Sequence, residues 1–175
     1  MIKERRSVRK YKDKQVSRET INNILDATRW SPSWANYQIA RYTIVENPEL
    51  IKRIAEEGVN GFTYNMGTLK NAKGVLVLSY IKGKSGKLSP EEYTTNKGGT
   101  WEMFDTGIAC QTFCLAAHNY GVGTCIFGVI DDAAISKILS LPENETVASV
   151  ITFGYPDGEA KVSPRYSVEE ITRYL

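Results

Sequence analysis

Three cations and a hydroxyl group stand within five residues near the start of the chain, in the order Arg5-Arg6-Ser7-Val8-Arg9. In an extended segment, Arg5, Ser7 and Arg9 point to one side and Arg6 points to the other. Guanidinium groups bind phosphate in a bidentate manner, and a serine hydroxyl adds a directional hydrogen bond. The pattern therefore predicts a phosphate site, although a solvated basic tail or a nucleic-acid-binding arm would have the same composition.

A second candidate segment is Ser31-Pro-Ser-Trp-Ala-Asn-Tyr-Gln38, which links a predicted helix to a predicted strand. Its serine and amide side chains, Ser33, Asn36 and Gln38, supply hydrogen-bond donors and acceptors, and its two aromatic side chains supply flat apolar surface. Loops in such positions run over the surface and often carry binding residues. The combination suits a planar heteroaromatic ligand, and an ordinary turn with two core aromatics is the alternative.

A third candidate is the glycine-rich segment Tyr120-Gly-Val-Gly-Thr-Cys-Ile-Phe-Gly128. Gly121 and Gly123 allow the backbone to approach a ligand closely or to take positive φ angles. The segment is not a dinucleotide-binding fingerprint, because it follows a helix and lacks the third glycine at the required offset. A helix end that leads into a strand is the simpler interpretation of this segment alone.

Apolar periodicity and capping residues predict the elements that must position these segments. Helices are expected from Ser17 to about Ser31, from Asn47 to Gly58, from Trp101 to Tyr120, from Asp131 to Leu139, and after the capping box Ser167-Val-Glu-Glu170. Strands are expected at 41–46, 74–81 and 147–153, and a mobile loop at 82–100. The long helix is expected to turn Phe104, Ile108, Ala109, Gln111, Leu115 and Ala116 inward. These elements predict one α+β domain over residues 1–175, with a mainly antiparallel sheet wrapped by helices.

The composition narrows the class of protein. The chain is 42% hydrophobic and 24% charged, as in ordinary globular proteins, and its net charge of +2 does not indicate nucleic-acid or membrane binding. No apolar h-region and no run of about 18 apolar residues is present, so neither a signal peptide nor a membrane span is expected. Three cysteines and one histidine do not form a zinc-site pattern. Buried free thiols in a cytoplasmic protein are the expected reading.

Two further features have structural interpretations. Cys110 and Cys114 lie one helical turn apart and could be redox-active, but no nearby cation is evident from the sequence, so core packing is preferred. His118, near the end of the long helix, is expected to interact with the helix dipole rather than to act as a base.

Taken together and in this order, the segments resemble the nitroreductase family of FMN-dependent oxidoreductases. Arg5-Arg-Ser-x-Arg9 resembles the phosphate-binding arm of that family, and Ser31-Pro-Ser-x-x-Asn-x-Gln38 resembles its loop at the flavin. The central helix is matched by Asp105-x-Gly-x-Ala-x-Gln-x-x-x-Leu-Ala-Ala117, followed by Gly121-Val-Gly-Thr124. Gly154-Tyr-Pro156 and Arg165 match its closing strand and C-terminal phosphate contact, so the resemblance extends from about residue 5 to residue 172.

The resemblance implies an intertwined homodimer with two shared FMN sites and no catalytic side chain beyond the flavin. It implies that Arg5, Ser7 and Arg165, with Arg6 in the same arm, hold the FMN phosphate. The other implied cofactor contacts are Arg9 and Asn65 at the pyrimidine edge, Ser33, Asn36 and Gln38 from the partner subunit or at the ribityl side, and the backbone of Phe127 and Gly128 near flavin N5.

The sequence also departs from the family pattern. The family's Gln-Pro-Trp is Gln38-Ile-Ala40 here, and Thr68 and Ser163 replace a second basic residue, which predicts reduced positive charge near the flavin. The helical excursion that covers the flavin in larger members is missing after Ile81. These differences affect the expected substrate more than the expected cofactor.

The functional hypothesis is a hydride relay from NAD(P)H through flavin N5 to an electron-poor small molecule such as a nitroaromatic or a quinone, without nucleic acid or membrane as partner. The flavin carries this chemistry, and the protein supplies binding, orientation and electrostatics. The alternative is a flavin-binding protein without turnover that serves storage or sensing.

Overall fold

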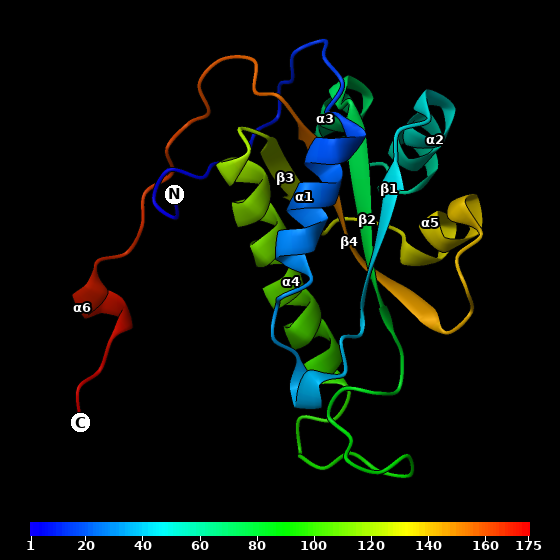
Figure 1. Ribbon diagram of the computed structural model, residues 1–175, viewed down its shortest axis with the longest axis vertical. Helices are drawn as coiled ribbons and strands as arrows, with labels where there is room; N and C mark the ends of the chain where they lie inside the picture. The colour runs from blue at the N-terminus through cyan, green and yellow to red at the C-terminus, as the bar shows by residue number, and fades with distance from the viewer.

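A four-stranded antiparallel sheet forms the centre of the computed structural model, which describes residues 1–175 (Figure 1). Its strands are β1 (Ala40–Val45), β2 (Gly74–Ile81), β3 (Gly123–Phe127) and β4 (Glu145–Gly154), in the order β1-β2-β4-β3. Each neighbouring pair is antiparallel, which confirms the predicted sheet type. The apolar strand β2 pairs on both sides and is buried at every residue except Tyr80, as a central strand requires.

Helices cover both faces of the sheet. One face packs against α2 (Pro48–Glu57), α3 (Thr63–Asn71) and α5 (Asp132–Leu139), and the other against α1 (Arg18–Thr28) and α4 (Thr100–Asn119) (Figure 1). A separate hydrophobic core lies on each face of the sheet. Alternate β2 residues pack into one core or the other, because successive strand side chains point to opposite faces. Val75 and Val77 join the first core, and Leu76 and Leu78 join the second. None of the helices has both the length and the apolarity to cross a bilayer.

Local signals correctly predict most helix boundaries. Ser17 caps α1 by accepting from the Thr20 N–H at 3.1 Å, and Asn47 caps α2 immediately before a proline at the first helical position. Asp131 caps α5 in the same way. The predicted capping box at Ser167 is present and begins the short helix α6 (Val168–Ile171).

The predicted inner face of α4 is wrong at Phe104 and Gln111, whereas Ile108, Leu115 and Ala116 are half-buried. Phe104 and Gln111 are exposed, and of the residues expected inside only Ala109 is buried. The helix carries apolar residues around its whole circumference, so periodicity does not distinguish its faces. Its buried residues are Glu102, Asp105, Thr106, Ala109, Cys110, Phe113, Cys114 and Ala117. Helix α3 was not predicted, since it is short, contains Gly67 and has no side-chain cap.

The basic segment at residues 5–11 is an ordered part of the fold. The Val8 N–H donates to the Thr124 carbonyl at 2.8 Å, which places this segment beside the edge strand β3. Tyr11 is buried, and its hydroxyl lies 2.6 Å from the Val8 carbonyl and 2.7 Å from Thr152 Oγ1. Burial raises the pKa of this hydroxyl. Val8 also packs directly over Gly123, where a side chain would collide with it. The alternative of a solvated tail is therefore excluded for this segment.

The C-terminal segment leaves the body of the domain after β4. Residues 161–175 are exposed apart from a half-buried Thr172, and α6 lies well away from the sheet and its helices (Figure 1). This segment nevertheless carries large apolar side chains, including Tyr166, Ile171 and Tyr174, of which Tyr174 is 89% exposed. Its apolar surface is not covered within one chain.

Candidate functional site

The N-terminal segment and residues 161–165 meet around a cavity of about 530 Å³, here called the arginine cavity. The basic segment and the C-terminal segment contribute six cationic side chains and no carboxylate: Lys3, Arg5, Arg6, Arg9, Lys161 and Arg165. Ser7, Ser163 and Gln111 add neutral polar groups. The cavity thus brings together Arg5, Arg6, Ser7 and Arg165, which the family resemblance implies as the phosphate site, and Arg9, which it implies at the pyrimidine edge. A lining of this charge and hydrogen-bonding capacity fits a phosphate-bearing ligand.

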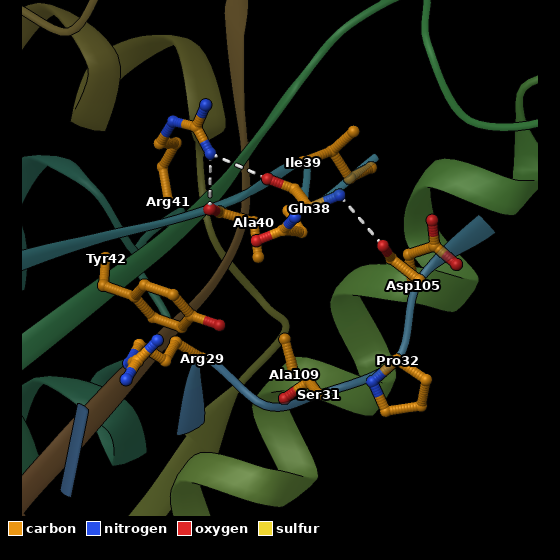
Figure 2. A pocket seen from close by; sticks show the side chains of 11 residues that line it. Arg29, Ser31, Pro32, Gln38, Ile39, Ala40, Arg41, Tyr42, Asp105 and Ala109 are labelled. Carbon is orange, nitrogen blue, oxygen red and sulfur yellow. Dashed lines mark hydrogen bonds between the residues drawn. The ribbon is translucent and has the colours of Figure 1, made fainter. Parts of the chain in front are cut away.

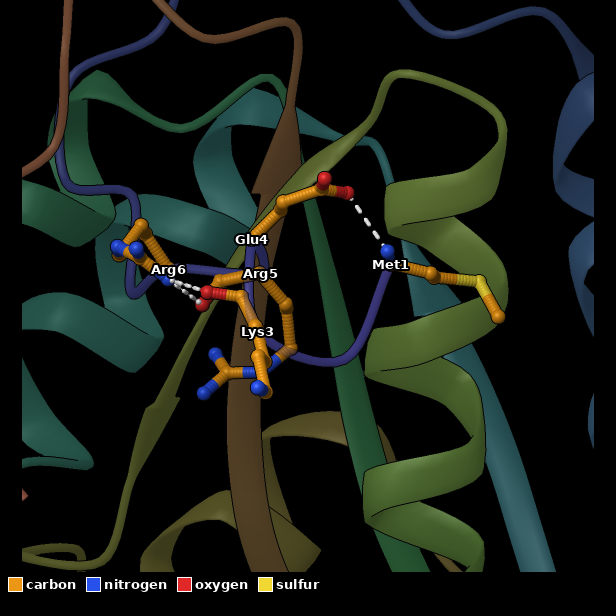
Figure 3. Close-up of polar contacts among 5 residues, drawn as sticks. All are labelled: Met1, Lys3, Glu4, Arg5 and Arg6. Atoms are coloured by element: carbon orange, nitrogen blue, oxygen red, sulfur yellow. Dashed lines mark hydrogen bonds and ion pairs between the residues drawn. The ribbon is translucent and has the colours of Figure 1, made fainter.

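The arginines of the cavity differ in how many of their donors are free. Arg6 folds back and donates to the carbonyls of Lys3 and Arg5 at 2.6 and 2.9 Å, while Glu4 pairs with the Met1 ammonium (Figure 3). The Nε–H of Arg5 is buried and has no hydrogen-bond partner. An unpaired buried donor is costly, and a bound anion would remove that cost. Arg5 is therefore the member of the cavity most suited to grip a phosphate.

Three polar residues of the cavity, Lys3, Lys161 and Gln111, are not among the site residues expected from the sequence. Lys161 lines the cavity two residues before Ser163, so the positive charge that Ser163 lacks is supplied from a neighbouring position. Residues two apart in an extended segment share a side, and this spacing could have identified Lys161. Gln111 reaches the cavity from the exposed side of α4, which the wrong inner-face assignment concealed.

Arg9 sits between the arginine cavity and helix α3. Its guanidinium donates to the Ser7 carbonyl at 3.3 Å and lies 5.8 Å from the centre of the Tyr64 ring. The next residue, Asn65, is buried on α3, and Thr68 is buried one turn further along. The fold thus brings Arg9 close to the segment that contains Asn65, as the shared role predicted for the two residues requires.

The second candidate segment borders a separate cavity of about 210 Å³, the loop cavity (Figure 2). Ser33 and Gln38 line it, and the Ser33 hydroxyl accepts from the Gln38 backbone N–H at 2.9 Å. Asn36 lies on the exposed 3₁₀ turn η1 (Trp34–Asn36) outside this cavity. The loop cavity shares no lining residue with the arginine cavity. Ser33, Asn36 and Gln38 are therefore not brought to the arginine cavity within the chain.

The glycine-rich segment forms strand β3 and the turn after it. Phe127 is buried in the core as the last residue of β3, and Gly128 is exposed immediately afterwards. Because the Phe127 side chain packs inward and Gly128 has none, these two residues can offer a ligand only backbone groups.

The environment of the cysteines corrects one expectation. Cys110, Cys114 and Cys125 are buried and free, as predicted. The sequence shows no cation near Cys110 and Cys114, but the structure places Arg5 close enough to affect the pKa of Cys114. A hydrogen bond from Cys110 lowers the pKa of the Cys114 thiol, and Thr124 and the positive charge of Arg5 add to this effect. The same hydrogen bond and burial raise the pKa of Cys110, and both thiols pack in the core beside α1.

The fold and the cavity together define a class: a helix-covered antiparallel sheet with a cation-lined cavity between its N-terminal segment and residues 161–165. Comparison with known proteins identifies the family. A profile described as "Nitroreductase family" matches residues 2–155. The chain therefore belongs to the nitroreductase family.

Individual relatives agree with this assignment. A protein of Archaeoglobus fulgidus with the provisional name "NADH dehydrogenase/NAD(P)H nitroreductase" is 32% identical over 99% of this chain and 95% of its own length. The "FMN reductase [NAD(P)H]" of Bacillus subtilis is 25% identical over 97% of this chain and 70% of its own. Among solved structures, an FMN-dependent nitroreductase of Clostridium difficile superimposes with a TM-score of 0.75 at 28% identity, covering 97% of this chain and 94% of the other.

Proposed function

We propose that this chain is an FMN-dependent NAD(P)H oxidoreductase that passes a hydride to an electron-poor small molecule, such as a nitroaromatic or a quinone. Membership of the nitroreductase family and the names of its relatives support the class of reaction. The arginine cavity is the observation that carries the cofactor assignment, because it offers six cations, no carboxylate and a buried Arg5 donor without a partner. Three free buried cysteines suit a reducing compartment such as the cytoplasm.

In this proposal Arg5, Ser7 and Arg165 hold the FMN phosphate, with Lys161 and Arg6 adding positive charge around it. Arg9 and Asn65 face the pyrimidine edge, and the backbone at Phe127 and Gly128 lies near N5. When bound, FMN supplies two-electron hydride chemistry at N5, and the side chains supply binding, orientation and electrostatics. Burial of Val8 and Tyr11 fixes the segment that carries Arg5, Ser7 and Arg9, so the phosphate-binding groups are held in place before the cofactor arrives.

The proposed assembly is a homodimer in which Ser33, Asn36 and Gln38 complete the cofactor site of the partner subunit. The exposed apolar residues of segment 161–175 support this assembly, because a second copy of the chain would cover them. Obligate interfaces commonly bury more than about 2,000 Å². Light scattering should find a dimer that keeps its flavin, whereas a stable monomer loaded with flavin would contradict the assembly.

The cofactor and the reaction can be tested together on the purified protein. Flavin absorption bands are expected, and mass spectrometry of the released cofactor should identify FMN, because the arginine cavity offers six cations and no carboxylate to a single phosphate group. Anaerobic addition of NADH or NADPH should bleach these bands rapidly. FAD in place of FMN would refute the cofactor, and FMN that resists bleaching would favour a binding protein without turnover.

A steric substitution should disturb the site without removing any polar group. In Gly123→Ala the added Cβ would lie 2.6 Å from Val8 Cγ2 and 2.8 Å from Val8 Cβ, so the basic segment must shift. Such overpacking costs about 1–3 kcal/mol, which lowers Tm by roughly 2–12 °C for a chain of this size. FMN binding should weaken as well, because Ser7 and Arg9 flank Val8. Thermal melts and FMN titration measure both effects.

The control for this substitution is Gly67→Ala on α3, where an added Cβ has no neighbour within 4 Å. Alanine also has a higher helix propensity than glycine, so the control should not lose stability. If Gly123→Ala kept the wild-type FMN affinity, the position of the basic segment would not determine cofactor binding.

A further inference from the structure

Two loops that are far apart in sequence meet on one buried carboxylate of α4. Asp105 is 4% exposed, and its two carboxylate oxygens each lie 3.0 Å from the backbone nitrogen of Trp34 in the segment 33–38. The Ser85 hydroxyl, which is fully buried in the loop after β2, donates to Asp105 Oδ2 at 2.6 Å. Asp105 thus holds the proposed flavin-contacting loop with one set of hydrogen bonds and the loop 83–86 with another.

No cation pairs with Asp105 among the ion pairs of the chain. Hydrogen bonds from Trp34 and Ser85 therefore balance its negative charge. Hydrogen bonds to an ionised acceptor are stronger than those between neutral groups, and losing one in a buried site leaves a charge without compensation. Moving either loop away from Asp105 is consequently unfavourable, and the two loops share the same acceptor.

A second buried carboxylate provides an internal comparison. Glu102, 7% exposed and one helical turn before Asp105, accepts from the backbone N–H groups of Gly83 and Lys84. Glu102 therefore anchors the loop 83–86 alone and has no contact with the segment 33–38 among its hydrogen bonds. Asp105 differs from Glu102 because its carboxylate accepts hydrogen bonds from both loops.

The segment 33–38 needs such an anchor because its backbone is strained. Ala35, Asn36 and Gln38 have φ angles of 43°, 55° and 50°, in the left-handed region that residues other than glycine seldom adopt. Beyond Asp105, one hydrogen bond joins the segment 33–38 to the residue that follows the loop 83–86, from the exposed Tyr37 hydroxyl to the Lys87 carbonyl at 2.8 Å. An open cavity of about 400 Å³ lies between Tyr37 and residues 83–90. Its shape depends on both loops keeping their positions.

We propose that Asp105 is a positioning residue that couples the two loops, so that cofactor binding at the segment 33–38 also orders the loop 83–86 and the cavity between them. This inference rests on the proposed contact of Ser33, Asn36 and Gln38 with FMN. The coupling runs from the Trp34 N–H through the Asp105 carboxylate to the Ser85 hydroxyl. It gives the enzyme a way to stabilise the cavity beside the flavin-contacting loop when the cofactor binds.

Hydrogen exchange measured by mass spectrometry, on the full chain without and with FMN, tests the coupling. In the wild-type protein FMN should slow exchange at both 33–38 and 83–86 by about tenfold or more, the factor set by about one hydrogen bond to a charged group. In Asp105→Ala, FMN should still slow exchange at 33–38 and should leave 83–86 unchanged within about twofold. A residue that merely stabilises the fold would not change the FMN dependence of one loop and spare that of the other.

Two matched variants separate the coupling from local damage. Glu102→Ala should raise exchange at 83–86 in the apoprotein and keep its response to FMN, because the Ser85–Asp105 bond remains. Ser85→Ala should abolish the response at 83–86 while FMN affinity stays within about twofold, because the Trp34–Asp105 bonds remain. If Asp105→Ala fails to fold, the Ser85→Ala result decides the question.

Several outcomes would overturn the proposal. FMN-dependent protection of 83–86 that persists in Asp105→Ala or Ser85→Ala would show that another route, such as Tyr37–Lys87, carries the effect. Protection confined to 33–38 in the wild type would show that the loops are independent. If FMN binds and leaves 33–38 unprotected, or does not bind, the proposed cofactor contact itself is wrong, and this result is distinct from a failure of the coupling.

Discussion

Replacing Arg5 with methionine should weaken FMN binding roughly ten- to 150-fold, the range that corresponds to about 1.5–3 kcal/mol for hydrogen bonds to a charged group. Methionine is similar in length to the aliphatic part of arginine, so the change removes the guanidinium and largely preserves packing. Arg5 should show the largest effect among the arginines of the cavity, because its buried Nε–H has no partner in the protein. Titration of apoprotein with FMN, followed by flavin fluorescence, measures the affinity.

Two variants test whether the effect belongs to Arg5 or to charge in general. Lys10→Met removes the same charge from an exposed position of the basic segment that does not line the arginine cavity, and it should change the affinity little. Arg6→Met should have an intermediate effect, because Arg6 already donates to two backbone carbonyls. Equal losses of FMN affinity in all three variants would indicate a diffuse electrostatic attraction and not a direct hydrogen bond from Arg5 to the phosphate.

Arg9→Gln should lower the two-electron potential of bound FMN by roughly 30–60 mV. Reduction makes the flavin N1–C2=O region anionic, so a cation at that edge stabilises the reduced form more than the oxidised form. The estimate takes about 1.5–3 kcal/mol for a charge-assisted hydrogen bond and about 30 mV per 1.4 kcal/mol for a two-electron couple. Thr68 stands where many family members carry a second cation, so Arg9 should account for a large share of the effect. Spectroelectrochemistry on both proteins provides the measurement.

FMN should remain bound in Arg9→Gln, since Arg5, Ser7 and Arg165 are unchanged. Lys10→Met is again the suitable control, with an expected potential close to that of the wild type. An unchanged potential in Arg9→Gln with full FMN occupancy would place Arg9 away from the pyrimidine edge. The 5.8 Å contact of Arg9 with Tyr64 would then be its main role.

Residues with local signals account for the parts of the fold that the sequence predicts well. Ser17, Asn47 and Asp131 mark helix starts because their side chains satisfy backbone N–H groups of the first turn, and this effect needs no tertiary information. The apolar run of β2 likewise predicts a central strand. The orientation of α4 could not be predicted, because its burial depends on Glu102 and Asp105, whose hydrogen-bond partners come from distant loops.

For the candidate site too, residues adjacent in sequence could be predicted, whereas residues brought together by the fold could not. Arg5, Arg6, Ser7 and Arg9 could be predicted as one group because they are adjacent in sequence, and Arg165 was added by family resemblance. Lys161 and Gln111 could not be predicted as cavity residues. Lys161 lines the cavity because of the path of the C-terminal segment, and Gln111 because it lies on the exposed face of α4. Coupling through Asp105 could not be predicted, since the Trp34 and Ser85 groups that meet there are 51 residues apart.

The left-handed backbone at Ala35, Asn36 and Gln38 has a consequence for laboratory evolution. A residue with a Cβ in this region costs about 1–2 kcal/mol, whereas glycine adopts it freely and loses only about 0.5–1 kcal/mol through the entropy of the unfolded chain. Ala35→Gly would therefore be neutral or stabilising at the level of the free protein. It would also let the loop visit many other conformations when no cofactor is present. Selection for heat resistance alone should favour glycine at this position, and selection for cofactor retention should oppose it.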